Sequence, residues 1–160
     1  MNYSAALKNP IFKTVQLVSD ELNYPTYVVG GWVRDLLLNK EKNKTDIDFV
    51  CVGSGIQLSE KVAEKLGNKA SFKVFKNFGT AMIHYKGDNY EYVGYRKESY
   101  LLDSRKPRVE NGTLQDDQTR RDFTINAMAI QLNTEHYGTL IDPFKGQEDL
   151  ANQIIRTPVN

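Results

Sequence analysis

Residues 26–38 read TYVVGGWVRDLLL, and a second informative stretch, residues 46–50, reads DIDFV. The β-branched and aromatic run at 26–29 predicts a short strand. The glycine pair that follows predicts a tight turn, and residues 32–38 have the composition of a helix. The first stretch therefore predicts a strand, a glycine turn and a helix in direct succession.

The second stretch belongs to an alternating segment, residues 46–52, which predicts another strand. Side chains alternate between the two faces of a strand. Asp46 and Asp48 therefore share one face, while Ile47 and Phe49 point to the opposite face and can pack in a core.

The rest of the chain mixes helical and strand patterns, and hairpin-like links join several of the strands. No internal repeat is visible, and 160 residues suit one domain. We expect an α/β (α+β) fold with a mixed sheet of about five strands flanked by helices. Further helices are predicted at 10–22, 56–66, 113–121 and 147–152, and further strands at 71–75, 80–85, 90–95, 127–132 and 139–141.

Residues 96–112 differ from their surroundings, because they are rich in Lys, Arg, Glu, Ser and Pro and show little periodicity. Such a segment is typical of a surface loop. We therefore predict a mobile loop here, and expect it to be the least ordered internal segment.

Composition and charge exclude few classes of protein. The net charge is +1, from 21 basic and 20 acidic residues, so any nucleic-acid site must arise from local arrangement. One cysteine, Cys51, excludes an internal disulfide and fits a reducing compartment. The N-terminus does not have the pattern of a secretory signal, and no stretch approaches the ~18 apolar residues of a membrane span. We expect a cytoplasmic protein without a membrane partner.

The paired carboxylates Asp46 and Asp48 are the strongest candidate for chemistry. Two residues apart on a strand, they lie about 6–7 Å apart along its axis. Hard oxygen ligands suit Mg²⁺, and two such ions can hold the attacking and leaving oxygens in phosphoryl transfer. The alternative is an exposed strand face that carries two aspartates.

The glycine pair Gly30-Gly31 is a candidate phosphate site, because it follows a strand and precedes a helix. Glycines let the backbone approach a ligand closely, and a helix start offers free N–H groups. Arg34, in the first turn, has a guanidinium that can bind a phosphate. The alternatives are a tight strand-to-helix turn and a solvated charge, since the spacing matches neither a P-loop nor a dinucleotide fingerprint.

A third polar cluster lies at residues 120–127, which read RRDFTINA. Arg120 and Arg121 offer donors for a triphosphate, and Asp122 and Asn126 offer polar groups for a ribose. The alternative is a capped helix end with ordinary salt bridges.

Together these stretches form an ordered set of motifs. Residues 30–38, 46–50 and 120–129, followed by DPFKGQEDL at 142–150, resemble the bacterial tRNA nucleotidyltransferase and poly(A) polymerase family. That family belongs to the DNA polymerase beta-like nucleotidyltransferases. The resemblance covers residues 27–155, and its specificity lies in the order and spacing of the motifs.

The resemblance implies roles for individual residues. Asp46 and Asp48 would hold Mg²⁺, and Asp122 and Asn126 would lie near the ribose or triphosphate. The remaining nucleotide-binding positions would be Gly30, Gly31, Arg34 and Arg121.

Four further residues match the family less specifically. Glu91 stands where the wider superfamily often has a third metal-binding carboxylate, although an exposed strand glutamate is the alternative. Arg96, Glu98 and Tyr100 match a family pattern at the start of the predicted loop, where a structural role and a catalytic one are both open.

The implied reaction is attack of an RNA 3′-hydroxyl on the α-phosphate of ATP or CTP, with release of pyrophosphate. The expected enzyme adds CCA to tRNA, and poly(A) addition is the alternative within the family. A nucleotidyltransferase for another hydroxyl and a non-catalytic nucleotide- or RNA-binding module are the rivals. The arginine and DPFKGQEDL motifs argue against the first, and intact Asp46 and Asp48 argue against the second.

Enzymes of the family are longer than this chain and continue into helical neck, body and tail regions that select the base and hold tRNA. We expect residues 1–160 to be the head domain alone, either as part of a longer protein or as a naturally short one. On its own, such a head domain is expected to bind Mg²⁺ and nucleoside triphosphates weakly and to be impaired in transfer.

Overall fold

The computed structural model describes residues 2–40, 45–100 and 107–159, and for 96–100 and 107–111 it describes the backbone alone. Within this part of the chain, seven strands form one sheet in the order β3-β4-β5-β2-β1-β8-β9. Strand β2 runs parallel to β5, and every other neighbouring pair is antiparallel. The strands are β1 (Thr26–Val29), β2 (Asp46–Cys51), β3 (Ser71–Phe75), β4 (Thr80–Tyr85), β5 (Asp88–Gly94), β8 (Ala129–Gln131) and β9 (Leu140–Ile141).

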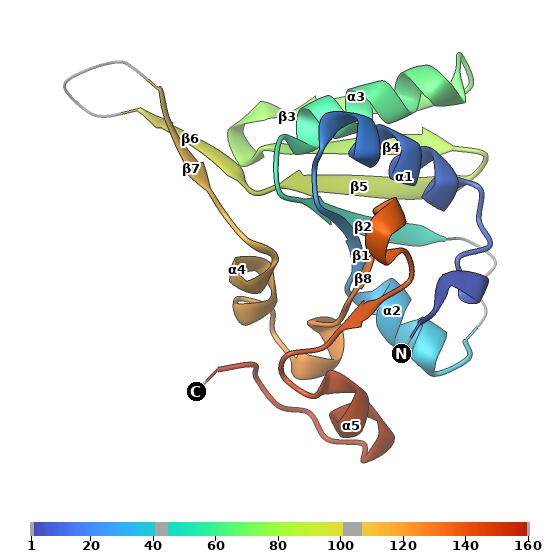
Figure 1. Cartoon of the computed structure of the whole chain (residues 1–160), viewed down its shortest axis with the longest axis vertical. Coiled ribbons are helices and arrows are strands. Elements are labelled where there is room, and N and C mark those ends of the chain that lie inside the picture. Colours follow the sequence, from blue (N-terminus) through green and yellow to red (C-terminus); the bar gives the residue numbers. More distant parts are fainter. Residues whose placement is uncertain (1, 41–44, 101–106, 160) are drawn as a thin grey trace.

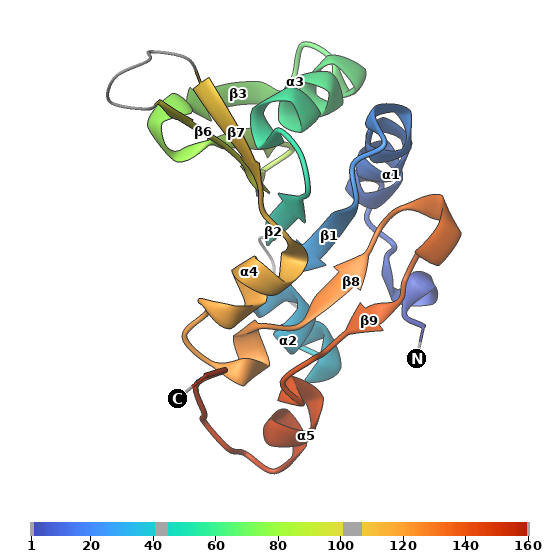
Figure 2. The ribbon, with the colours of Figure 1, turned by 60° about the vertical axis from the view of Figure 1, so that its left-hand side comes forward.

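The predicted α/β class and the mixed sheet are confirmed, and each predicted helix is present. Helices α1 and α3 cover one face of the sheet, while α4 lies on the other side (Figures 1 and 2). The helices are α1 (Ile11–Leu22), α2 (Gly31–Leu37), α3 (Gly55–Leu66), α4 (Leu114–Thr119) and α5 (Gly146–Ala151), with short 3-10 turns η1 (Ser4–Ala6), η2 (Lys76–Phe78), η3 (Thr124–Asn126) and η4 (Thr134–His136).

The main core fills the space between the sheet and the helices α1 and α3. Phe49 stacks on Tyr92 with ring centroids 5.0 Å apart, and it meets Phe12 of α1 edge-on at 6.0 Å. Ile47 and Phe49 are both buried, as the alternation of β2 predicts. The opposite face of the sheet has a smaller apolar cluster that includes Val50, so the face that carries Asp48 is only partly covered.

Two expectations about the strands need correction. The sheet is larger than the predicted five strands, because the short β8 and β9 extend it beyond β1. Within the predicted loop at 96–112, the described backbone forms the antiparallel strands β6 (Arg96–Tyr100) and β7 (Pro107–Asn111). Backbone hydrogen bonds suffice for such pairing, so two strands can pair without apolar alternation in their sequence.

The β6–β7 hairpin projects away from the body of the molecule (Figure 1). Arg96, Glu98 and Tyr100 lie on β6, where they pair with residues of β7. The predicted mobility of this segment stays a prediction, and its central part, residues 101–106, lies outside the described residues. None of the helices formed by the described residues is long and apolar enough to cross a membrane.

Candidate active site

Three neighbouring strands bring the carboxylates to one place. Asp48 on β2 lies opposite Val29, the last residue of β1, and beside Glu91 on β5. Because Gly30 directly follows Val29, the glycine turn, Asp48 and Glu91 meet at the same level of the sheet. Glu91, the third carboxylate that the family resemblance suggested, is thus the strand neighbour of Asp48.

Gly30 is the point at which the two halves of the site meet. Its φ of +75° lies in a region that residues with a side chain rarely adopt. A Cβ atom there would lie 3.1 Å from Nη1 of Arg121 and 3.7 Å from Oδ2 of Asp48. The absence of a side chain therefore lets a guanidinium and a carboxylate approach the same backbone atom.

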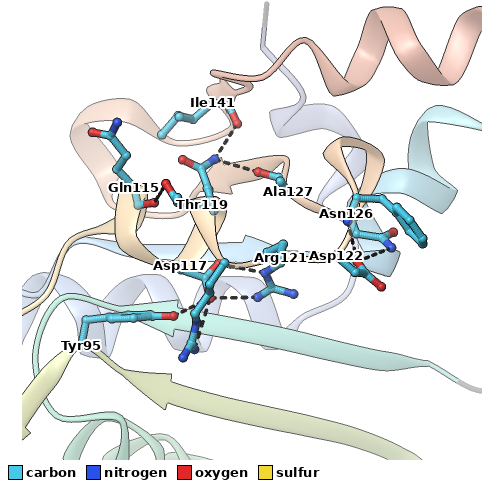
Figure 3. Close-up of polar contacts among 12 residues, drawn as sticks. Tyr95, Gln115, Asp117, Thr119, Arg121, Asp122, Asn126, Ala127 and Ile141 are labelled. Carbon is cyan, nitrogen blue, oxygen red and sulfur yellow. Dashed lines mark hydrogen bonds and ion pairs between the residues drawn. The ribbon is translucent and has the colours of Figure 1, made fainter. Parts of the chain in front are cut away.

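Arg121 is fixed by a residue that the sequence did not reveal as part of the site. Asp117, only 2% exposed, accepts hydrogen bonds from Nε of Arg121 at 2.9 Å and from Nη2 at 3.2 Å (Figure 3). Tyr95 donates its hydroxyl to the same carboxylate at 2.6 Å. The four-residue spacing of Asp117 and Arg121 was the available signal, because such residues are neighbours on a helix.

A second chain of hydrogen bonds joins the other predicted residues. Nη1 of Arg34 donates to Oδ1 of Asn126 at 2.8 Å, and Nδ2 of Asn126 donates to Oδ1 of Asp122 at 3.2 Å. Nε of Arg34 also donates to Asp35 at 3.1 Å. Gly31 lies against the Arg34 guanidinium, since a Cβ atom there would be 3.4 Å from Nη2. The glycine and arginine motifs are therefore in direct contact.

An open cleft of about 520 Å³ lies between these groups. Carboxylates and guanidiniums face it together, which suits a ligand that carries both a metal ion and phosphates. Its lining consists of Asp48, Val50, Glu91, Val93, Asp117, Arg120, Arg121 and Asp122.

Asp46 lies at the edge of this arrangement. It is exposed and lines a smaller recess of about 110 Å³ beside Trp32 and Leu36 of α2. Its charge nevertheless acts on Asp48 across the shared strand face. The expectation that the two aspartates share one face is met, although only Asp48 lines the larger cleft.

The protonation of Asp48 and Glu91 is shifted by their surroundings. Burial raises the pKa of Asp48, and the charge of Asp46 raises it further, while Arg121 and a hydrogen bond with Glu91 act in the opposite direction. Burial likewise raises the pKa of Glu91, as do the charge of Asp48 and the hydrogen bond to it. Both carboxyl groups thus hold protons more tightly than in water, because like charges and burial disfavour ionisation.

The donor set fits Mg²⁺. Among the described residues, no group of three or more His, Cys, Asp or Glu side chains is arranged to hold a metal by itself. Mg²⁺ is usually bound by one or two carboxylates together with substrate phosphates, so such a closed cage is not required. Asp48 and Glu91 are strand neighbours joined by a hydrogen bond, so two carboxylates stand side by side at the cleft, and a divalent cation bound there would offset the repulsion between their charges.

A pH dependence of stability follows from these shifts. A carboxyl group whose pKa is raised by folding stabilises the fold fully below its unfolded pKa, 3.8 for Asp and 4.5 for Glu, and loses this effect as pH rises through the folded pKa. We expect the melting temperature of the metal-free chain to fall as pH rises above 4.5 and through the raised pKa values of the two groups. Thermal unfolding followed by circular dichroism in EDTA measures it.

The variant Asp48→Asn should flatten this dependence, since it removes one of the two coupled groups. Asp149 does not obscure the result. Hydrogen bonds from Arg156 and Thr124 lower its pKa, so its stabilising effect is lost only as pH falls below 3.8. A wild-type melting temperature that rose across the range would contradict the assigned shifts.

Comparison with known proteins places this geometry in a family. The family model described as the poly A polymerase head domain matches residues 26–156, which include both strands of the carboxylate site and the arginine motif. The chain belongs to the poly A polymerase head domain family. The resemblance inferred from the sequence motifs is thereby confirmed.

Two relatives of this chain have names that refer to nucleotide addition to RNA. The A-adding tRNA nucleotidyltransferase of Aquifex aeolicus (strain VF5) is 45% identical over 81% of this chain and 15% of its own length. The CCA-adding enzyme of Staphylococcus saprophyticus subsp. saprophyticus is 34% identical over 96% of this chain and 37% of its own length.

A solved structure shares the fold. It is a tRNA nucleotidyltransferase complexed with a primer tRNA and an incoming ATP analog, with a TM-score of 0.76 and 40% identity. The match covers 90% of this chain and 38% of that one. The chain therefore spans well under half of the length of each of these relatives.

Proposed function

We propose that residues 1–160 form the nucleotidyltransferase head of an enzyme that transfers CMP and AMP from CTP and ATP to the 3′-hydroxyl of tRNA. The observation that supports this most directly is the meeting of Asp48 and Arg121 at Gly30. It sets a metal-binding carboxylate beside a phosphate-binding guanidinium, which phosphoryl transfer requires. A poly(A) polymerase of the same family is the alternative.

Each residue has a part in the proposed reaction. Asp48 and Asp46 hold Mg²⁺, and Glu91 is positioned to assist them. When bound, the ion lowers the pKa of the attacking hydroxyl and offsets the charge of the triphosphate. Arg121 binds the phosphates from the opposite side of the cleft.

The second hydrogen-bonded chain has a binding role in this proposal. Arg34, lying against Gly31, adds a second guanidinium for the phosphates. Asn126 and Asp122 present an amide and a carboxylate, which suit ribose hydroxyls or water around the triphosphate.

The named relatives support tRNA as the acceptor, since those proteins are tRNA nucleotidyltransferases of the A-adding and CCA-adding kinds. Because this chain matches relatives of both kinds, the similarity does not by itself identify the nucleotide that is added. We propose that base selection depends on helical regions outside these 160 residues. A cytoplasmic location is part of the same proposal, supported by a tRNA substrate and a single cysteine.

Nucleotide transfer tests the proposal. The chain is incubated with Mg²⁺, a tRNA that lacks its 3′ CCA, and each nucleoside triphosphate in turn, radiolabelled at the α-phosphate. We expect slow, Mg²⁺-dependent labelling of the tRNA with little preference among ATP, CTP, GTP and UTP, because phosphate contacts do not identify a base.

A second arm of the experiment places the head domain within a longer relative. The chain replaces the matching region of the Staphylococcus saprophyticus CCA-adding enzyme, and we expect labelling from CTP and ATP to be restored. Failure of both arms, with a folded chain, would contradict the proposed activity. Strong selection of CTP and ATP by the isolated chain would contradict the assignment of base selection to other regions.

A further inference from the structure

We propose that Asp117 and Tyr95 are positioning residues, which hold the Arg121 guanidinium in the orientation that binds phosphate. The inference rests on the proposed function, in which Arg121 contacts the triphosphate. Neither residue needs to touch the nucleotide for this role. Both act through the guanidinium that they orient.

The hydrogen bonds of Asp117 determine which edge of the guanidinium faces the cleft. Its carboxylate engages Nε and Nη2 of Arg121 side by side, a paired arrangement that fixes the plane of the group. The remaining nitrogen, Nη1, is the one that lies toward Gly30. Asp117 therefore leaves one N–H-bearing edge of Arg121 directed at the carboxylate side of the cleft.

Tyr95 prevents the Asp117 carboxylate from turning. Its hydroxyl donates to Oδ1 of Asp117 at 2.6 Å, and burial raises the pKa of this hydroxyl, so it stays a donor. The backbone around Tyr95 is itself fixed, because its carbonyl accepts a hydrogen bond from the N–H of Gly112 at 2.7 Å. A Cβ atom on Gly112 would lie 2.8 Å from the Tyr95 ring, so the ring fits closely against this glycine.

This anchor lies at the base of the β6–β7 hairpin, which begins directly after Tyr95 and ends directly before Gly112. The guanidinium of Arg120 lies 5.2 Å from the centre of the Tyr95 ring. The Tyr95 hydroxyl thus links the hairpin base to the carboxylate that holds Arg121 (Figure 3).

A second network provides a matched control. Asp149 is 1% exposed, accepts the hydroxyl of Thr124 at 2.6 Å, and pairs with Arg156. It thus repeats the Asp117 arrangement of carboxylate, arginine and hydroxyl. Neither Asp149 nor Arg156 lines the cleft, and Asp149 contacts neither Arg121 nor Arg34 in this network, so it serves as the control for the loss of a buried, hydrogen-bonded carboxylate.

The two possible effects of Asp117→Asn on triphosphate affinity have opposite directions. Asp117→Asn removes a negative charge from the cleft, which by electrostatics alone would tighten the binding of an anionic triphosphate. Lost positioning of Arg121 would weaken it instead. Tyr95→Phe removes a hydrogen bond without changing any charge, so it tests positioning alone.

The experiment measures, by isothermal titration calorimetry, the Kd of the 160-residue chain for ATP with Mg²⁺ and for inorganic tripolyphosphate. We expect Asp117→Asn to raise both Kd values about tenfold, the range of one charge-assisted hydrogen bond. We expect Tyr95→Phe to raise them about threefold, because Tyr95 acts on Arg121 only through Asp117. In an Arg121→Ala background, neither change should weaken binding further, since both act through Arg121. Asp149→Asn should lower the melting temperature but leave both Kd values within about twofold.

The outcomes separate this inference from the proposed function. If Arg121→Ala weakens binding but Asp117→Asn and Tyr95→Phe do not, the positioning role is wrong and the proposed function stands. If Arg121→Ala itself leaves binding unchanged, the phosphate role of Arg121 fails, and the inference fails with it. Additive losses in the Arg121→Ala background, or an equal loss in Asp149→Asn, would show a general structural effect and would also overturn the inference.

Discussion

Asp48→Asn should reduce nucleotide transfer about a thousandfold or more, while the metal-free fold stays as stable as before or becomes more stable. The loss is expected because the Asp48 carboxylate lies beside Glu91 and close to both Arg121 and Gly30. Removing a metal-binding charge at the reacting phosphate forfeits several kcal/mol of transition-state stabilisation, or about a factor of a thousand for ~4 kcal/mol.

The stability half of this expectation comes from the pKa shift. Burial and the neighbouring Asp46 raise the pKa of Asp48, so at neutral pH the ionised side chain is less favourable in the fold than in the unfolded chain. An amide of the same shape carries no charge and avoids this unfavourable term. Functional sites often show such a conflict between stability and activity.

Two measurements on the same protein check both halves. Transfer is followed with radiolabelled triphosphate and tRNA in the domain-replaced enzyme, and thermal unfolding is followed for the isolated chain in EDTA at about pH 7.5. Glu60→Gln is the control, because Glu60 is an exposed residue of α3, on the opposite face of the sheet. It should change neither the transfer rate nor the melting temperature. Near-normal transfer by Asp48→Asn would remove Asp48 from the metal site, and a large drop in melting temperature would assign it a structural role.

Local sequence patterns predicted the parts of the fold that depend on local geometry. The alternation of β2 placed Ile47 and Phe49 in the core and Asp48 on the opposite face, because strand periodicity is a property of consecutive residues. The tight turn at Gly30-Gly31 was predicted because two consecutive glycines are themselves a local turn signal. The sequence did not predict the positive φ of Gly30 or the position of Arg121 beside it. Both became visible only in the folded structure.

The features that the sequence did not reveal depend on contacts between distant segments. Asp117 was not singled out in the sequence, and its contact with Tyr95 became visible only when the end of β5 and α4 were brought together. The hairpin pairing within residues 96–112 was missed because their sequence shows little periodicity, whereas the pairing of β6 with β7 rests on the backbone. The extra strands β8 and β9 were each predicted, yet their joining to the same sheet through β1 was not.

Arg121→Ala should weaken the binding of ATP with Mg²⁺ about a hundredfold, whereas Arg120→Ala should weaken it no more than about threefold. The two arginines are adjacent in the sequence and both line the cleft, but Arg121 is held more firmly than Arg120. Arg121 is 23% exposed and held by two hydrogen bonds to Asp117, while Arg120 is 63% exposed and 3.7 Å from the same carboxylate. A fixed, half-buried guanidinium loses little freedom on binding phosphate, and its charge is screened less by water.

Arg121→Lys distinguishes orientation from charge. Lysine keeps the positive charge but cannot engage Asp117 with two parallel hydrogen bonds while directing a third nitrogen at Gly30. We therefore expect a loss of about tenfold, between those of wild type and Arg121→Ala. Calorimetric titration of the three variants with ATP and Mg²⁺ gives all the values. Equal losses for Arg120→Ala and Arg121→Ala would mean that the cleft attracts the triphosphate through its overall charge, and that the fixed contact of Arg121 with Gly30 has no special part in binding.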